Sequence, residues 1–349
     1  MNILLRGLWV VLAGALLFCL GCRSASSPAG PADVSEAAPH AAHRSTGDSN
    51  EVANLEDPVE KEFQKILADD DAAQDEIDKW IRDFNASPTR AAATARAALR
   101  AKIEQREQPI KKDYESFVLR HSGHVRARLA YGSYLNDTGD EEGAQTQWEK
   151  ARELDPRNPA AWNNLGDIYS HGGGEDKVFE CYEKAIEINP KEPVYLENLA
   201  VTVYLYRKTA QERYHLTEQQ VFDKSLELYR KALALDPKNF TLACNYAESF
   251  YGTNPARWED GLAAWTDVLK IAATPTEKEG VYVHLARINI HLGRLDDARQ
   301  CLGQINDNMY ASLKQTLTRN LNEAQGKAQG TNAAPAASES TGTNSLPAK

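Results

Sequence analysis

The sequence lacks an excess of positive charge, and cysteine is scarce in it. Its 349 residues carry a formal net charge of −10, whereas a nucleic-acid-binding protein needs a basic surface, so the balance argues against a nucleic-acid partner. Three of the five cysteines, Cys181, Cys244 and Cys301, lie in the body of the chain without a C-x-x-C spacing. Because an odd number cannot pair completely within one chain, we expect these three to be small residues packed among helices.

The motifs of common enzyme sites are missing as well. The sequence contains no G-x-S-x-G, H-E-x-x-H, G-x-x-x-x-G-K-[ST] or G-x-G-x-x-G motif, which removes the usual hydrolase, zinc-protease and nucleotide sites. Glu175 and Asp176 follow the glycines at 172–174 and would repel a phosphate, so this triplet is better explained as a turn. His284 and His291 are too far apart on one predicted helix to chelate one ion. We therefore predict no catalytic site, metal or cofactor.

Only one long apolar run is present, at the N-terminus. Leu8 to Leu20 is short for a membrane-spanning helix and typical of a signal peptide. The run ends in C-L-G-C at residues 19–22, which resembles a bacterial lipobox with cysteine where that motif usually has leucine. The resemblance implies removal of residues 1–21 and a lipid anchor on Cys22. Because Arg23 is not the aspartate that retains some lipoproteins at the inner membrane, the periplasmic face of the outer membrane is favoured. An ordinary cleaved signal, or an uncleaved anchor, is the alternative.

Residues 22–54 separate this segment from the rest of the chain. They are rich in Ser, Ala and Pro and show almost no apolar periodicity, which is typical of a flexible tether. A flexible segment of this length spans roughly 30 Å root-mean-square, enough to hold a folded body away from a membrane.

The clearest pattern in the chain ends at Pro190. Apolar and small residues recur at helical spacing on both sides of a glycine break, at Trp162, Leu165, Gly166, Tyr169, Val178, Tyr182 and Ala185. This spacing predicts two short amphipathic helices back to back, and a proline ends a helix because it cannot donate a backbone hydrogen bond. The pattern resembles the tetratricopeptide repeat (TPR). The resemblance implies an all-α, right-handed superhelical solenoid of antiparallel helix pairs, whose first helices line a concave side.

The same pattern recurs along the chain with a period of 34 residues, as between Gly132 and Gly166 or Trp148 and Tyr182. We expect five units, at residues 125–158, 159–192, 193–239, 240–276 and 277–307. The third unit has about 13 extra residues near 206–219, because its later landmarks follow their counterparts by 47 residues. Thr217 and Gln220 form a capping-box signature, so the second helix of this unit should begin there. The insertion should then lengthen the first helix and the loop.

The segments on either side of the array lack the full signature. Residues 55–124 contain four amphipathic pieces, which we interpret as degenerate repeats that cap the array, with a helix boundary at Asp69–Asp71. Residues 308–323 predict a capping helix, because stacked repeats bury each face only against a neighbour. Residues 324–349 are of low complexity and are predicted to be disordered.

An asparagine occupies the same place in three successive units, at Asn164, Asn198 and Asn245. In the TPR fold this place faces the concave groove, and carboxamides offer both donors and an acceptor, so such a ladder can hold the backbone of an extended peptide. Asparagine is also common there in TPRs generally, and both explanations stay open. Matching groove positions carry Asn163, Asp167, Glu197, Val201, Tyr204, Cys244, Glu248 and Tyr251. Arg126 and Arg287 are the only basic residues that we place on this face, which disfavours recognition of a free C-terminal carboxylate.

Charge is uneven near the start of the array. Residues 51–83 are rich in acidic side chains, and residues 90–128 are rich in basic ones. A basic patch would suit an anionic polymer of the cell wall or lipid headgroups, whereas acidic helices packed beside basic ones would neutralise both. We favour neutralisation.

The combined prediction is a non-catalytic protein–protein interaction scaffold. It would be a membrane-anchored TPR lipoprotein that binds an extended peptide or partner protein in its concave groove during envelope assembly. In layout it resembles lipoproteins of outer-membrane assembly and pilus biogenesis. The alternative is a structural protein that binds peptidoglycan or another anionic polymer.

Overall fold

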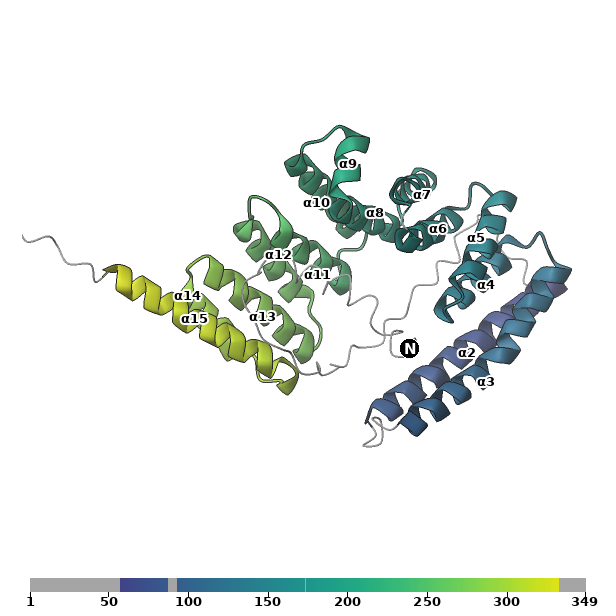
Figure 1. The fold of residues 1–349 in the computed structure, drawn as a ribbon, viewed down its shortest axis with the longest axis horizontal. Helices are drawn as coiled ribbons and strands as arrows, with labels where there is room; N and C mark the ends of the chain where they lie inside the picture. Colours follow the sequence, from purple (N-terminus) through teal and green to yellow (C-terminus); the bar gives the residue numbers. More distant parts are fainter. Residues whose placement is uncertain (1–56, 87–92, 173, 333–349) are drawn as a thin grey trace, which may run out of the picture. The chain divides into compact units, whose positions relative to one another are not determined.

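The computed structural model describes residues 57–86, 93–172 and 174–332, and every regular element among them is a helix (Figure 1). The predicted all-α solenoid of antiparallel helix pairs is confirmed. The predicted signal peptide, Cys22 and the tether lie outside the described residues. No described helix is both long and apolar enough to cross a membrane. The chain divides after Pro237 into two compact units, which we call unit 1 and unit 2.

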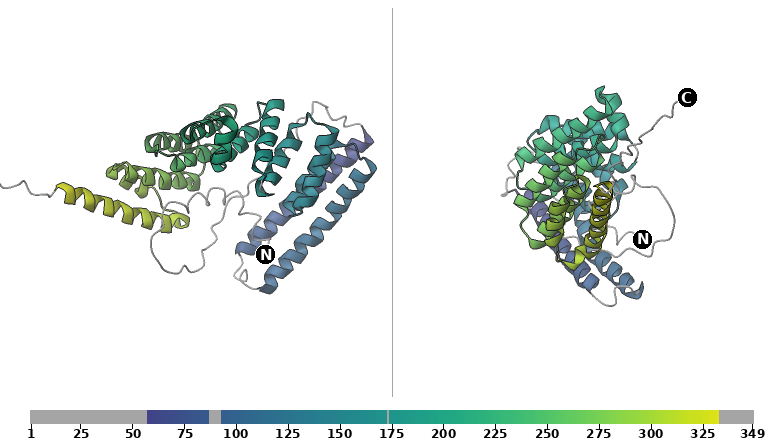
Figure 2. Two further views of the ribbon diagram at one scale, coloured as in Figure 1. Left: turned by 45° about the horizontal axis from the view of Figure 1, so that its top comes forward. Right: turned by 90° about the vertical axis from the view of Figure 1, so that its left-hand side faces the viewer.

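Unit 1 begins with a long hairpin of α2 (Pro58–Ala86) and α3 (Ala93–Arg120), where four shorter helices were expected (Figure 2). The predicted boundary at Asp69–Asp71 is wrong because Asp70 is fully buried in the middle of α2. Its carboxylate accepts a hydrogen bond of 2.8 Å from the Tyr114 hydroxyl of α3. A run of acidic residues therefore continues a helix here, since one of its members has a buried partner.

Acidic α2 and basic α3 neutralise one another, as the second interpretation of the charge pattern predicted. Arg106 pairs with Glu76 at 3.0 Å, and Arg120 forms an ion pair with Glu62. The ammonium of Lys102 lies 3.7 Å from the centroid of the Trp80 ring. The basic side chains of α3 that are seen in these pairs are thus directed toward α2.

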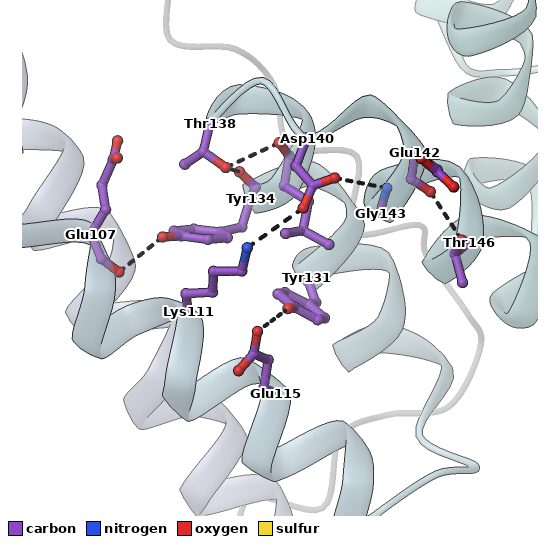
Figure 3. A network of polar contacts seen from close by, with 11 residues as sticks. Glu107, Lys111, Glu115, Tyr131, Tyr134, Thr138, Asp140, Glu142, Gly143 and Thr146 are labelled. Carbon is purple, nitrogen blue, oxygen red and sulfur yellow. Dashed lines mark hydrogen bonds and ion pairs between the residues drawn. The ribbon is translucent and has the colours of Figure 1, made fainter. Parts of the chain in front are cut away.

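A network of polar contacts attaches the hairpin to the first helix pair (Figure 3). The Tyr134 hydroxyl donates to the Glu107 carbonyl oxygen at 2.9 Å, and the Tyr131 hydroxyl donates to Glu115 at 3.2 Å. Lys111 donates to Asp140 at 3.5 Å. The hairpin is therefore fixed to the first repeat by both backbone and side-chain acceptors.

The repeats of unit 1 follow the predicted pattern of helix pairs. They are α4 (Val125–Asp137) with α5 (Glu141–Leu154), α6 (Pro159–Gly172) with α7 (Glu175–Ile188), and α8 (Pro193–Leu205) with α10 (Glu218–Leu235). A β-carbon added at Gly132 would lie 2.3 Å from the Trp148 ring, and one at Gly166 would lie 2.7 Å from the Tyr182 ring. These glycines are required because each helix pair closes on an aromatic side chain of its second helix.

The insertion in the third repeat forms its own helix, α9 (Arg207–Tyr214), instead of lengthening α8. The capping box predicted from Thr217 and Gln220 is present at the start of α10, with both reciprocal hydrogen bonds made. Between the two helices, His215 adopts a positive φ of 54°, which ends α9 and reverses the chain.

Unit 2 contains two further helix pairs and a terminal helix. The pairs are α11 (Phe240–Ser249) with α12 (Trp258–Ile271), and α13 (Pro275–His291) with α14 (Leu295–Gly303); short 3₁₀ turns lie at η2 (Phe250–Gly252) and η3 (Asn308–Tyr310). Helix α15 (Ala311–Asn332) buries Leu317 and Leu321 against α13 and α14. It continues past the boundary expected at residue 323, so the first part of the predicted tail is helical.

Candidate functional site

The predicted binding residues lie on the first helices of the repeats, except Tyr251, which lies in the η2 turn directly after α11. We call the side of each unit formed by these elements its first-helix face. In unit 1 the face comprises α4, α6 and α8, and in unit 2 it comprises α11, the η2 turn that follows it, and α13. Each face belongs to its own unit.

In unit 1, asparagines connect neighbouring first helices. The side-chain nitrogen of Asn198 on α8 donates to the side-chain oxygen of Asn163 on α6 at 2.9 Å. Asn163 is buried, whereas Asn198 is only half-buried. One member of the predicted ladder, Asn198, therefore makes a structural bond between repeats, and Asn198 and Asn245 are both half-buried.

Asn164 is also buried, and its amide has partners inside unit 1. In the amide orientation that satisfies the neighbouring groups, the side-chain nitrogen of Asn164 donates to the Ala160 carbonyl oxygen at 3.3 Å. Its side-chain oxygen accepts from Trp148 Nε1, also at 3.3 Å. A carboxamide held in this way supports the helix pair. Its position in the repeat is the predicted one, but its hydrogen-bonding groups are directed into the fold.

Of the three residues predicted for binding on α6, Asn163 and Asn164 are buried and Asp167 is exposed. Its carboxylate accepts a hydrogen bond of 2.5 Å from the Tyr182 hydroxyl, the aromatic residue that packs on Gly166. The residue as a whole is exposed, but desolvation of its carboxyl group raises the pKa to about 6. The hydrogen bond from Tyr182 opposes this rise, because it favours the charged form of the carboxyl group. The packing of this helix pair thus fixes the direction of Asp167.

The remaining residues predicted for unit 1 differ in exposure. Tyr204 is only 5% exposed; its ring packs on Phe222, with centroids 5.8 Å apart, and the Arg207 guanidinium lies 5.6 Å from it. Glu197 and Val201 are half-buried. Tyr204 therefore packs within the third repeat, because the inserted helix brings Arg207 over it.

The first-helix face of unit 2 gathers aromatic rings around His284. The Tyr251 hydroxyl and His284 Nδ1 are 3.0 Å apart. The His284 ring stacks on buried Trp265, with centroids 3.9 Å apart and planes 11° apart. Nearby, Trp258 lies 6.0 Å from Tyr251 and stacks on His291 at 4.2 Å. Stacking of this kind fixes ring orientation.

The electrostatics of this cluster keep its rings neutral. Burial, together with the charge of Arg287, lowers the pKa of His284 to about 3. Burial also raises the pKa of the Tyr251 hydroxyl and raises the pKa of Glu248 to about 6, while the charge of Arg287 opposes the rise at Glu248. At neutral pH the cluster therefore offers a neutral imidazole and phenol beside one carboxylate and one guanidinium.

Sequence reasoning found three members of this cluster, Glu248, Tyr251 and Arg287, but it missed His284. A signal was available. His284 lies two residues before Ala286, just as Asn245 lies two residues before Ala247, so it continues the asparagine row by one unit. Among the described residues, no group of histidine, cysteine and acidic side chains is arranged to hold a metal ion.

Residues 125–168 and 159–192 match two models of the tetratricopeptide repeat. A search of the curated proteins gives no match. Among solved structures, the chain is similar to PilW, titled a widely conserved type IV pilus biogenesis factor (14% identity, 64% of this chain and 96% of that chain covered, TM-score 0.48). It is also similar to PilF of Pseudomonas aeruginosa (14% identity, 66% of this chain and 95% of that chain covered, TM-score 0.46). A third similar structure is YrrB, titled a TPR protein with an unusual peptide-binding site (11% identity, 59% of this chain and 97% of that chain covered, TM-score 0.44). The matched repeats are of a kind that generally mediates binding of proteins or peptides.

Proposed function

We propose that this chain is a non-catalytic interaction scaffold that binds an extended peptide or a partner protein on its first-helix faces. The observation that carries the proposal is the cluster of Glu248, Tyr251, His284 and Arg287 in unit 2. The His284 ring stacks on Trp265, and the Tyr251 ring stacks on His284, so little side-chain entropy is lost when a ligand binds. Tyrosine and arginine are also the side chains that most often anchor protein interfaces.

In unit 1 the proposed contacts are fewer than the sequence predicted. Asp167, Glu197, Asn198 and Val201 retain exposure on the first-helix face. Asn163, Asn164 and Tyr204 are buried, and we assign them the role of holding α6 and α8 in place. The binding residues of unit 1 would then surround Asp167, whose direction Tyr182 fixes.

A co-purification experiment tests this function. The double variant Glu248→Gln/Arg287→Ala and the control Arg299→Ala would be used to recover partners from membrane extracts by affinity purification. Arg299 is an exposed arginine that pairs only locally with Asp296, at 2.6 Å. We expect a partner recovered with wild type and with the control to fall at least tenfold with the double variant. Equal recovery with all three proteins contradicts the proposal.

The proposal extends to the cell envelope through the lipobox-like sequence that ends at Cys22. A diacylglyceryl group on Cys22 would hold the scaffold on the periplasmic face of the outer membrane, where it would act in envelope assembly. We expect Cys22→Ala to move the chain from the membrane fraction to the soluble fraction, or to leave it as an unprocessed precursor. A variant that is processed and fractionates like wild type would remove the anchor. We do not extend the proposal to cell-wall polymers, because the basic residues Arg106 and Arg120 of α3 pair with α2.

A further inference from the structure

Unit 1 has a second candidate binding surface, a groove between the second helices α7 and α10. It has a volume of about 530 Å³ and is lined mainly by apolar residues: Ile186 and Pro190 at one wall, Leu196 and Leu199 of α8 at the floor, and Leu228 and Leu235 of α10 at the other wall. This volume lies in the range of roughly 300–1,000 Å³ that is usual for ligand sites. None of the exposed residues of the proposed first-helix site lines it.

The inserted helix α9 closes one end of this groove. Tyr214 at its C-terminus lines the groove and donates to Glu183 of α7 at 2.6 Å. The Tyr214 ring lies edge-on to Phe179 of α7, with centroids 5.9 Å apart, and Lys224 of α10 lies 4.1 Å from it. A short helix from this chain is thus already seated against α7 and α10. The surface that α9 contacts combines apolar side chains with polar partners at the edge of the groove.

The charges at the rim leave a positive excess. Burial alone would raise the pKa of Glu183, but hydrogen bonds from Arg213 and Tyr214 lower it, and Arg213 lies 2.6 Å away. On α10, Lys231 pairs with Glu227 at 2.8 Å. Among the charged residues that line the groove itself, Lys224 and Lys231 are basic and Glu183 is acidic, so the lining carries one positive charge in excess.

Leu235 is an exposed leucine in the lining of the groove, at 43% exposure. The floor and the inner wall are buried at Leu196, Leu199 and Leu228. An apolar partner that covers Leu235 would extend this buried surface, at about 25 cal/mol for each Å² removed from water. The driving force for docking would thus come from the end of the groove opposite α9.

We propose that this groove docks an amphipathic helix of a partner protein, with leucine-type side chains on the groove floor and an acidic flank beside Lys224 and Lys231. The partner helix would lie in the groove beyond the C-terminal end of α9, as in helix-in-groove recognition. This inference is independent of the proposed first-helix site, because none of the residues proposed for that site lines the groove.

The chain offers a matched control for Leu235. Leu154 lies two residues before Pro156, just as Leu235 lies two residues before Pro237, and its exposure of 47% is nearly the same. No inserted helix lies between the two helices of its repeat, α4 and α5, whereas α9 lies between α8 and α10 in the repeat of Leu235. Leu154→Asp and Leu235→Asp therefore make the same change at equivalent, exposed positions.

The probes are two fluorescent stapled helices of roughly 14 residues, about 21 Å long at 1.5 Å per residue. Both carry leucine on one face, and they differ only in having glutamate or lysine on the flanks. Binding to the full-length chain is followed by fluorescence anisotropy. We expect the glutamate-flanked helix to bind wild type and Leu154→Asp equally, and to bind Leu235→Asp and Lys224→Glu at least tenfold more weakly. We also expect the lysine-flanked helix to bind wild type at least tenfold more weakly.

Three outcomes would overturn the inference. One is no binding of the glutamate-flanked helix to wild type, and another is equal weakening by Leu154→Asp and Leu235→Asp. The third is a wild-type dimer in light scattering that Leu235→Asp dissociates, which would assign the groove to a second copy of the chain. Circular dichroism of each variant verifies that a loss of binding is not a loss of helix.

Discussion

Tyr204 and Tyr251 occupy the same place in successive repeats, five residues after Leu199 and Tyr246, but the structure uses them differently. Tyr204 is buried between Phe222 and Arg207 in unit 1. Tyr251 is half-buried and shares a contact of 3.0 Å with His284 in unit 2. The repeat position decides which face a residue lies on. Its neighbours decide whether the residue supports the fold or is available to a partner.

The largest effect is expected where the packing of a helix pair leaves no room. Gly166→Ala would place a β-carbon 2.7 Å from the Tyr182 ring, and overpacking of this kind costs about 1–3 kcal/mol. We expect unit 1 to lose stability by this amount in urea unfolding. Gly172→Ala is the control, because a β-carbon there has no atom within 4 Å. Equal effects of the two substitutions would contradict the close packing that positions Asp167.

In unit 2, the pH dependence of stability tests the burial of His284. Its pKa is lowered from 6.5 to about 3, so below pH 6.5 the unfolded chain binds a proton that the folded chain does not. Its contribution to stability is therefore complete above pH 6.5 and is lost as the pH falls toward 3. We expect wild type to lose more stability than His284→Gln over this interval. Parallel losses in thermal unfolding would show that the ring is not desolvated.

Glu248 is expected to act in the opposite direction. Its pKa is raised from 4.5 to about 6, so its folded form favours the proton, and stability falls as the pH rises from 4.5 to 6. We expect Glu248→Gln to be more stable than wild type above pH 6, by at most about 2 kcal/mol. The difference should vanish below pH 4.5. A difference that does not depend on pH would mean that the carboxyl group is not desolvated.

The smallest effect is expected at the bond between Asn198 and Asn163. Asn163→Ala removes the acceptor of this hydrogen bond. We expect the loss of stability to be about 1 kcal/mol, because the half-buried Asn198 can form a hydrogen bond to water instead. Asn198→Ala should cost more, because it leaves the side-chain oxygen of buried Asn163 without this donor. The double variant should lose less than the sum of the two single losses, since the two residues share one bond. Additive losses would contradict the bond.

The helix pairs could be predicted because their determinants are local. Glycine, aromatic residue and proline recur at fixed spacing, and each pair closes on itself, as Gly166 does on Tyr182. The hairpin could not be predicted, because Asp70 continues α2 only through a partner on α3, Tyr114. No local pattern of acidic residues distinguishes a helix end from a helix with one buried carboxylate.

The candidate site was predicted in outline for the same reason. Repeat position placed Asn164, Tyr204 and Tyr251 on the groove side of the repeats, but burial depends on contacts outside the repeat signature. Tyr204 is buried because the insertion supplies Arg207, and the insertion is the part of the array that departs from the pattern. His284 was predictable from its position but was judged only as a metal ligand.

Photo-crosslinking in cells tests the central claim that the first-helix face of unit 2 contacts a partner. Benzoylphenylalanine would replace Tyr251 in one variant and Tyr204 in another, at equivalent places in their repeats. We predict a discrete adduct of higher mass from position 251 and none from position 204. Adducts of equal yield from both positions, or none from position 251 in cells that express the folded chain, would contradict the account.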